Sequence, residues 1–576
     1  MKGAEGIGHA IRIGGLLVAL AFTQIGQAQV PPTPPPIAPP TAPTAPTVPT
    51  TPTAAPTTAP TWTVLTPTGG PPHPRFLHTA VYDDITNRMI IFGGSDNISR
   101  VLNTVWVLTN ADGLALPSTW TQLNPLGGPP APRTSATAVY DPGSSSMIVF
   151  GGQPAAVCSG LNDVWVLSNA TGLGLAPTWT QLSPLGTAPG PRRQHTAVYD
   201  GSTNRMIVFG GDPCTANPSN DVWMLSNANG RGGTPAWTQL ATVGPGAPCA
   251  SSATPCAFPA RSAHSAVYDP ISNRMIVFGG LLCDAPGCPL LNDVWALTNA
   301  NGVGGVPVWT QLAVAGGPPP ARMLHSATYD PATNSMTVFG GKTAAGTGLN
   351  DAWVLSNANG VGGTPTWTPL AVAAGAAPSA RWGHTAVYRA LTNRMTIFDG
   401  LNNPTGWALM DTWVVTNANG RISMPLAALS AMQVSIDPAT NTFDVKGNYT
   451  LGAGGSTNPL TDNVTVQLRN QYGTASITIP GGSFQLVQGQ YDFSGVVNGA
   501  PVEAVITPQG PATFSFSVSA AGVPNLPAAN PINLTFITGN NAGTIPVAAT
   551  ITSPAGTAPA PTPIAPAPTL PPPPTL

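Results

Sequence analysis

The sequence predicts an all-β protein: a six-bladed β-propeller closed by an N-terminal strand and followed by an immunoglobulin-like β-sandwich. Three observations lead to this prediction. A unit of strand-like runs recurs six times, part of a unit precedes the first full copy, and short alternating runs follow residue 420. Repetition at a regular spacing indicates a repeat architecture, and alternation of apolar and polar residues indicates half-buried strands.

The repeated unit contains four strand-like runs. In the third copy, TAVYD and NRMIVFGG flank a turn at residues 201–203, and NDVWML and WTQL follow. Such runs, joined by Gly- and Asn-rich connections, predict a four-stranded antiparallel sheet. Sheets of this kind cover both of their faces when they stack around an axis. A tyrosine in the first run marks each copy, at Tyr82, Tyr140, Tyr199, Tyr268, Tyr329 and Tyr388.

The two ends of the repeated region predict how the ring closes. The fourth run of a unit carries a tryptophan, and the series is Trp62, Trp120, Trp179, Trp237, Trp309 and Trp367. Its first member precedes the first tyrosine run, whereas no such run follows Trp413 in the sixth unit. We therefore expect residues 62–65 to form the outer strand of the sixth blade, which leaves few open strand edges.

A Gly-Gly pair after the second run, with a tyrosine before it and a tryptophan after it, resembles the kelch repeat. The resemblance covers roughly residues 62–420. Blade 6 departs from it with Asp399-Gly400, and blade 2 has Ala136 where the other blades carry histidine. The resemblance implies a propeller of four-stranded blades, but the functions of such proteins range from protein binding to oxidase and sugar-isomerising chemistry. The pairs are Gly93-Gly94, Gly151-Gly152, Gly210-Gly211, Gly279-Gly280 and Gly340-Gly341.

The regions outside the repeats differ in composition. Residues 1–28 are expected to be a secretory signal peptide, because Lys2 and Arg12 precede an apolar run at residues 13–22. An uncleaved anchor is the alternative, although the run is short for a membrane span. The Pro-rich residues 29–60 and 553–576 are expected to be a linker and a disordered tail. Residues 61–422 are the predicted propeller and residues 423–552 the predicted sandwich.

Composition limits the classes of partner. Charged residues make up 7% of the chain, and the formal net charge is −2. A chain of this kind predicts no nucleic-acid partner and no binding to an anionic membrane surface. Insertion into a membrane is not expected once the signal peptide is removed.

An Arg-x-x-His pattern opens five of the six units. A ring of metal ligands or acid-base groups is chemically possible. A group that recurs in every blade is better explained by structure, with arginine donating to backbone carbonyls and histidine closing the inner strand against the next sheet. The residues are Arg75 with His78, Arg192 with His195, Arg261 with His264, Arg322 with His325, and Arg381 with His384, while Arg133 stands alone.

Carboxylates suited to catalysis are scarce. The only glutamates are Glu5 and Glu503, both outside the predicted propeller. Many aspartates stand in repeated turns or before the third-run tryptophan, and an aspartate in a turn usually hydrogen-bonds the local backbone. A copper-radical site of the galactose-oxidase kind would need Tyr, His and a Tyr-linked Cys in one place, and no such asymmetric cluster is recognisable. The sequence therefore predicts no catalytic residue, no metal site and no cofactor.

Variation in connection length predicts a binding face. The connections between runs one and two, and between runs three and four, have constant lengths, whereas the other two kinds vary. The variable connections emerge on one end of the ring, and variable loops on a rigid scaffold commonly form recognition surfaces. Trp382 and Trp407 lie outside the repeated pattern in such connections. They are candidate ligand contacts, and covering the closure seam is the alternative role.

All six cysteines also fall in the variable connections. An exported chain with an even number of cysteines favours disulfides, and six cysteines permit fifteen pairings. We expect Cys249 with Cys256, Cys283 with Cys288, and Cys158 with Cys214. Zinc binding is the alternative, but CxxC spacing is absent.

The expected function is therefore that of a binding and scaffold protein of a secreted, bacterial type. It would be secreted, periplasmic or associated with the cell surface, and would recognise a protein or a glycan through the variable-loop face. The alternative is a carbohydrate-active enzyme of the galactose-oxidase or sugar-mutarotase type.

Overall fold

The computed structural model describes residues 59–552 apart from residues 99, 115–116, 155–158, 215–216, 245–259, 283–287, 403–405, 422–423, 453–454, 471–472, 498, 524–525 and 540. Contacts along the chain divide it into Met1–Pro52 and Thr53–Leu576. Every described residue belongs to the second of these units. The predicted signal peptide, most of the predicted linker and the predicted tail lie outside the described residues.

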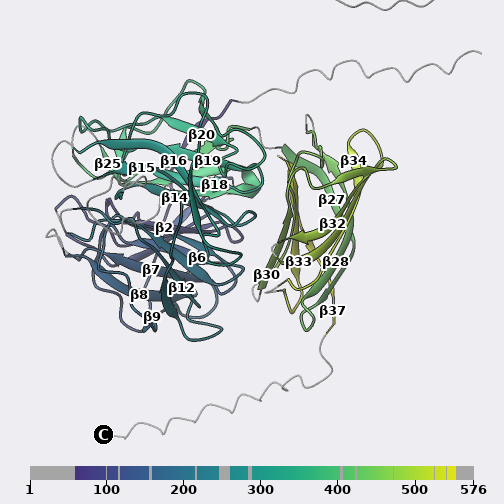
Figure 1. Ribbon diagram of the computed structural model, residues 1–576, viewed down its shortest axis with the longest axis horizontal. Helices are drawn as coiled ribbons and strands as arrows, with labels where there is room; N and C mark the ends of the chain where they lie inside the picture. The colour runs from purple at the N-terminus through teal and green to yellow at the C-terminus, as the bar shows by residue number, and fades with distance from the viewer. Residues whose placement is uncertain are drawn as a thin grey trace, which may run out of the picture. The chain divides into compact units, whose positions relative to one another are not determined.

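Four-stranded antiparallel sheets repeat along residues 79–416 (Figure 1). The second strand of each sheet has no exposed side chain, because neighbouring sheets cover both of its faces. Blades 1 to 3 consist of β2 (Thr79–Asp83), β3 (Arg88–Phe92), β4 (Val105–Thr109) and β5 (Thr119–Leu123); β6 (Thr137–Asp141), β7 (Ser146–Gly152), β8 (Leu161–Ser168) and β9 (Thr178–Leu182); and β10 (Thr196–Asp200), β11 (Arg205–Phe209), β12 (Val222–Ser226) and β13 (Ala236–Gln239).

Blades 4 and 5 repeat the same order of strands. They consist of β14 (Ser265–Asp269), β15 (Arg274–Leu281), β16 (Leu290–Thr298) and β17 (Val308–Gln311), and of β18 (Ser326–Asp330), β19 (Ser335–Phe339), β20 (Ala352–Ser356) and β21 (Thr366–Pro369). Blade 6 contains β23 (Thr385–Arg389), β24 (Arg394–Phe398) and β26 (Thr412–Thr416), with the short 3-10 helix η1 (Ala390–Thr392) between the first two.

The fourth strand of blade 6 is β1 (Trp62–Leu65), which pairs with β26 in antiparallel fashion. The predicted closure is therefore present. Trp62 takes the same place as the outer tryptophan of every other blade, which packs on a phenylalanine of the preceding blade at 4.8–5.2 Å between ring centroids. Trp62 packs on Phe339 of blade 5, and Trp120 of blade 1 packs on Phe398 of blade 6. The series of contacts is thus cyclic.

Six backbone hydrogen bonds form a second closed cycle, one per blade. Each joins the residue before the histidine position to the equivalent carbonyl of the preceding blade, over 2.8–3.1 Å. Because each of these residues is both donor and acceptor, the cycle also links blades 6 and 1, whose bonded residues Gly383 and Leu77 are far apart in the chain. The donor and acceptor residues are Leu77 to Gly383, Ser135 to Leu77, Gln194 to Ser135, Ala263 to Gln194, Leu324 to Ala263, and Gly383 to Leu324.

The glycine pair after the second strand permits the inner strand to approach closely. Gly94 has a φ of 95°. A Cβ atom at this position would lie 2.8 Å from Cβ of His78 and 3.0 Å from the carbonyl oxygen of Phe76. Only glycine combines this backbone conformation with so little space.

At the end of the blades opposite these glycines, a second network joins neighbouring sheets. An asparagine after the third strand donates to the aspartate that ends the first strand of the preceding blade, over 2.7 Å. The same asparagine accepts from a second asparagine, which in turn accepts from the marker tyrosine. The pairs that join the blades are Asn229 with Asp141, Asn301 with Asp200, Asn359 with Asp269, and Asn419 with Asp330.

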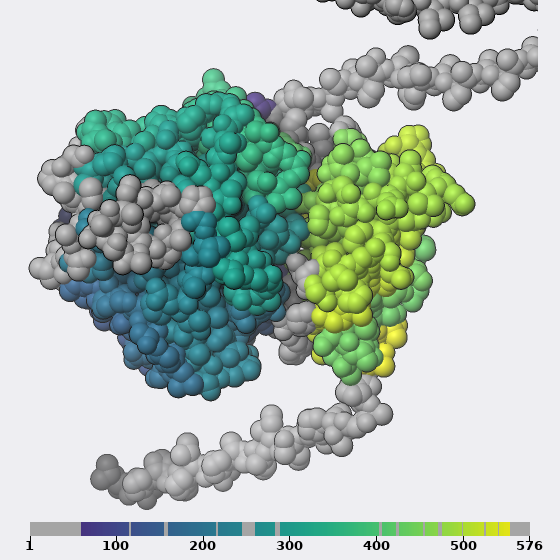
Figure 2. Space-filling model, viewed as in Figure 1, coloured from purple at the N-terminus to yellow at the C-terminus, as the bar shows by residue number. Residues whose placement is uncertain are grey.

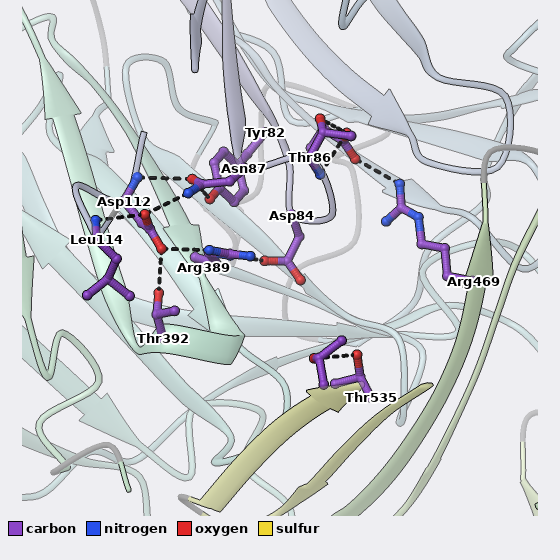
Figure 3. A network of polar contacts seen from close by, with 12 residues as sticks. Tyr82, Asp84, Thr86, Asn87, Asp112, Leu114, Arg389, Thr392, Arg469 and Thr535 are labelled. Carbon is purple, nitrogen blue, oxygen red and sulfur yellow. Dashed lines mark hydrogen bonds and ion pairs between the residues drawn. The ribbon is translucent and has the colours of Figure 1, made fainter. Parts of the chain in front are cut away.

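The seam between blades 6 and 1 replaces this hydrogen bond by an ion pair (Figure 3). Blade 6 has Arg389 at the aspartate position, blade 1 has Asp112 at the asparagine position, and their side chains lie 2.7 Å apart. Burial tends to raise the pKa of Asp112, but hydrogen bonds from Arg389, the Leu114 backbone and Asn87 outweigh it and hold this pKa below its usual value. The carboxylate is therefore charged where the two ends of the propeller meet.

Asp83 has a different partner. Blade 2 has Thr171 at the position where blades 3 to 6 carry the donating asparagine. Arg469 pairs with Asp83 instead, at 2.9 Å, and both side chains are buried (Figure 3). A departure from the repeat thus coincides with a partner from outside the repeats.

Residues 424–551 form a second β structure of β27 (Met424–Asp437), β28 (Thr442–Leu451), β29 (Val464–Asn470), β30 (Gly473–Ile479), β31 (Gln485–Val487), β32 (Gln490–Val497), β33 (Ala500–Pro508), β34 (Thr513–Ala520), β35 (Ile532–Thr538), β36 (Asn541–Val547) and β37 (Thr550–Ile551). The hydrogen-bonded order is β30-β29-β35-β36-β27-β28-β34-β33-β32-β31, with β37 beside β27. Figure 2 shows its residues in green to yellow.

The strand β27 belongs to both halves of this C-terminal β domain. It runs parallel to β36 at its start and antiparallel to β28 from Leu426 onward. A single core includes Leu468 and Phe536 from one half and Val445 and Phe516 from the other. The immunoglobulin-like part of the prediction is not confirmed, because that fold has two separate sheets, whereas here the pairing is continuous through one strand.

Candidate functional site

The repeated arginines are buried within their own blades. Each donates from Nη1 to the carbonyl oxygen of the residue that follows the second-strand phenylalanine, over 2.9–3.1 Å. In blades 2 to 6 the guanidinium also binds the aspartate before the third-strand tryptophan. Blade 1 has Thr104 at that position, and the buried Asp399 of blade 6 accepts from the Arg75 backbone at 2.6 Å. These contacts leave the arginines inside the blades rather than facing a ligand.

The five histidines lie between blades. Each Nε2 bonds, over 2.8–2.9 Å, to a threonine or serine hydroxyl that begins the first strand of the preceding blade. Burial lowers the pKa of His195 and of His325 to about 3, and a nearby arginine adds to the effect. Burial likewise lowers the pKa of His78, His264 and His384 well below the usual value. All five are therefore neutral at neutral pH.

A small recess lies where the six inner strands begin. Its volume is about 130 Å³, and every blade lines it with the histidine position and the residue before that position. Thr79 at the start of the inner strand β2 pairs with Phe92 at the end of β3. The start of the inner strand therefore lies beside the variable connection that leads from the second strand to the third. The recess therefore opens on the face that the sequence predicts to be variable.

One ring of positions at this recess differs in every blade. The residue two places before the histidine position pairs with the first residue after the Gly-Gly pair in blades 1 to 5, and β22 (Arg381–Trp382) pairs with β25 (Leu401–Asn402) in blade 6. We name these twelve residues the mouth. They are Phe76 with Ser95, Thr134 with Gln153, Arg193 with Asp212, Ser262 with Leu281, Met323 with Lys342, and Trp382 with Leu401.

The mouth has an apolar arc in blades 5, 6 and 1. Met323, Trp382 and Phe76 are only half-buried there. The Phe76 and Trp382 rings meet edge to face at 6.1 Å, and Nζ of Lys342 lies 4.9 Å from the centre of the Trp382 ring. This arc therefore presents two aromatic rings, a thioether and one cation on one side of the recess.

Blades 2 and 3 form a polar arc opposite. Arg193 pairs with Asp212 at 2.5 Å and donates to Gln153 at 2.9 Å. Asp212 and Gln153 are buried and Arg193 is half-buried. The charges of this arc are thus compensated within the arc, whereas blades 5, 6 and 1 carry the cation and the apolar surface.

The two candidate tryptophans do not share one surface. Leu401 pairs with Trp382 on one side and with Ala408 on the other. Trp407 is the neighbour of Ala408 in the chain. Because side chains alternate along a strand, Trp407 lies on the other side of this small sheet. Trp407 is 59% exposed, near the similarly exposed Met410 in sequence, and the Asn97 side chain of blade 1 bonds to the backbone of Ala408. Trp382 belongs to the mouth, and Trp407 belongs to the seam between blades 6 and 1.

Sequence reasoning missed most of the mouth. Only Trp382 was singled out, because it is a tryptophan outside the repeated pattern. The signal that could have found Phe76, Arg193, Met323 and Lys342 is the alignment of the six units on one another. The arginine or glycine just before each of these positions recurs, while these positions change from blade to blade.

Two of the cysteines lie within the described part of the chain. Cys214 and Cys288 each take part in a disulfide bond. Cys158, Cys249, Cys256 and Cys283 lie outside the described residues, so the predicted pairings stay predictions. Within the described ranges, no three His, Cys, Asp or Glu residues come together as a metal site.

Comparison of the sequence with known protein families shows which family the chain belongs to. The KLHDC2/KLHL20/DRC7 Kelch-repeats domain matches this chain at residues 54–176, 174–298 and 292–468. The chain belongs to this kelch-repeat family. Kelch propellers generally mediate protein interactions.

The chain is also similar to plant and fungal kelch proteins. It is 30% identical to adagio-like protein 3 of Oryza sativa subsp. japonica, over 52% of this chain and 42% of that protein. It is 30% identical to acyl-CoA-binding domain-containing protein 5 of Arabidopsis thaliana, over 33% and 26%. It is 29% identical to tip elongation aberrant protein 1 of Schizosaccharomyces pombe, over 41% and 18%. The chain thus spans less than half the length of these relatives.

These relatives contradict the predicted localisation. The chain was expected to be secreted, periplasmic or associated with the cell surface, whereas its relatives are plant and fungal kelch and adagio-like proteins rather than secreted bacterial ones. The expectation depended on basic residues before a short apolar run, a pattern of composition that is not unique to signal peptides. In the part of the chain that the structure describes, no helix is long and apolar enough to cross a membrane.

Proposed function

We propose that this kelch propeller binds a segment of a partner protein at the mouth. The mouth position two residues before the histidine carries a different residue in each of the six blades, and this observation carries the proposal. Residues needed to build each blade recur, whereas a site for one ligand must break the symmetry of the ring. The central recess and the variable connections around it give the partner a concave surface on a rigid scaffold.

Trp382 is the proposed centre of the contact. A half-buried tryptophan beside a second aromatic ring offers a large apolar surface with little conformational entropy to lose, as is common at binding hot spots. Trp407, at the seam between blades 6 and 1, is proposed as a contact at the margin for a partner that extends beyond the mouth.

Arrays of peptides and of glycans, probed with the full chain, test this function. Peptides should bind, and Trp382→Ala should weaken the strongest of them by at least tenfold, which corresponds to about 1.4 kcal/mol. Trp407→Ala is the matched control and should weaken binding by about twofold to threefold, since an exposed marginal contact contributes less. Both variants should keep the parent's melting temperature within a few degrees, because neither ring is part of a blade core.

Two results would count against the proposal. Peptides that bind Trp382→Ala as tightly as the parent would place the contact elsewhere. Binding of glycans but not of peptides at the mouth would replace the protein partner by a carbohydrate.

A further inference from the structure

We infer that the segment bound at the mouth carries an acidic side chain one or two positions from a large apolar one. This inference rests on the proposed function and adds the chemistry of the partner. It starts from Lys342, whose backbone is held by two hydrogen bonds to Met323, of 2.9 and 3.1 Å. The side chain of Lys342 then reaches across to the ring of Trp382.

Lys342 is the uncompensated charge of this face among the described residues. Its ammonium contacts the Trp382 ring, and no carboxylate of the described chain forms an ion pair with it, whereas the other described lysine, Lys446, lies 3.6 Å from Asp444. The arginines nearest the mouth are already paired: Arg193 with Asp212, and Arg100 with Asp96. An incoming carboxylate therefore finds one available cation at the mouth.

The surroundings of Lys342 decide the second part of the inference. Trp382, Met323 and Phe76 are half-buried beside it, so an apolar side chain placed there removes further apolar surface from water. An ammonium over an aromatic face is partly desolvated, and a carboxylate that approaches it is less screened than at an open surface. In an extended segment, positions one or two apart are separated by about 3.3 to 7 Å along the segment, and side chains two positions apart lie on the same face. An acidic and an apolar side chain at this spacing can reach the cation and the apolar arc together.

The polar arc argues against a bound segment that carries a basic side chain in place of the acidic one. A basic segment would meet Lys342 without a free carboxylate to offset it, because Asp212 is buried and engaged by Arg193. Like charges at a partly desolvated site weaken binding. The mouth should therefore reject segments whose central charge is positive.

Selection from a phage-displayed library of random twelve-residue peptides, with the full chain as target, tests the inference. The parent should enrich Asp or Glu within two positions of Trp, Phe, Leu or Met. Lys342→Glu should lose at least tenfold in affinity for these peptides and should enrich Lys or Arg at the same place. Lys446→Glu makes the same change of charge on an exposed strand of the C-terminal domain and should select the parent's peptides.

The outcomes separate this inference from the proposed function. If peptides bind in a way that Trp382→Ala abolishes, but show no acidic preference or no reversal with Lys342→Glu, the inference fails and the function stands. If the selected peptides bind Trp382→Ala as well as the parent, the function itself fails. Binding of the acidic peptides should also weaken as salt is raised, and salt-independent binding would contradict the role of Lys342.

Discussion

Single residues that depart from the repeat occur in compensating pairs at the seam between blades 6 and 1. Arg389 replaces an aspartate in blade 6, and Asp112 replaces an asparagine in blade 1, so that the hydrogen bond of the four interfaces between blades 2 and 6 becomes an ion pair. Blade 1 also lacks the aspartate that binds the repeated arginine, and Asp399 supplies a carboxylate beside Arg75. Burial raises the pKa of Asp399 well above its usual value, although Arg75 opposes this shift. The seam where the first and last parts of the repeated region meet therefore has its own polar contacts.

Restoring the repeat at the seam tests this compensation. Arg389→Asp alone should lower the free energy of unfolding by about 3 kcal/mol, because it leaves the buried Asp112 beside a second carboxylate. Asp112→Asn added to Arg389→Asp recreates the pair found at the four interfaces between blades 2 and 6 and should recover part of this loss, because Asp84, 3.5 Å from Arg389, still loses its cation. Urea unfolding of the parent, both single variants and the double variant measures the coupling. Strictly additive losses would show that the two residues do not act as a pair.

At the scale of an element, β1 completes a sheet whose other strands come from the far end of the repeated region. It contributes four backbone pairings to β26 and the Trp62 contact with Phe339. Without β1, the outer edge of β26 would be open, and unpaired edges favour association between molecules.

Deletion of residues 59–66 should open the ring. Loss of a buried tryptophan alone costs about 3–5 kcal/mol, so the deletion should lower the melting temperature by at least about 4 °C. It should also produce oligomers in size-exclusion chromatography. Deletion of residues 569–576 removes the same length of chain and is the control. A deletion of residues 59–66 that melts like the parent would show that β1 is dispensable for the propeller.

At the scale of the whole molecule, the five interblade histidines make stability depend on pH. Their pKa values in the folded protein are lowered, to about 3 for His195 and His325, whereas an unfolded histidine has a pKa of about 6.5. The unfolded chain therefore binds more protons below pH 6.5, and stability is lost as the pH falls from about 6.5 toward 3. Each histidine contributes a slope of up to about 1.4 kcal/mol per pH unit.

Urea unfolding between pH 7.5 and 5 measures this slope. All 14 tryptophans lie between residues 62 and 413, so their fluorescence reports on the propeller rather than on the C-terminal domain. Stability should be constant above about pH 7 and should fall below it. His195→Gln should reduce the slope of stability against pH by up to about 1.4 kcal/mol per pH unit, which is the contribution of one proton. This change in slope is expected whatever the effect of the substitution on stability at neutral pH. A stability that does not change down to pH 5 would contradict the burial of neutral histidines.

The candidate site could be predicted only in part. The variable-loop face follows from connection lengths, and Trp382 follows from its place outside the pattern. Lys342 and Phe76 carry no such mark, because a lysine or a phenylalanine in a loop is ordinary. Their importance comes from the ring contacts that Trp382 makes with both. Trp407 was grouped with Trp382 by sequence, but strand alternation separates them. Contacts between blades cannot be read from residues that lie far apart in the chain.

The sequence by itself determined the number of blades, the four strands of each and the origin of the closing strand. It could do so because every blade must solve the same packing problem, and the same residues therefore recur. Only the tertiary structure decided which departures from the repeat compensate one another, how β27 joins the two halves of the C-terminal domain, and where the mouth lies. These features depend on pairings between distant residues, and each occurs once, so no repetition in the chain reveals them.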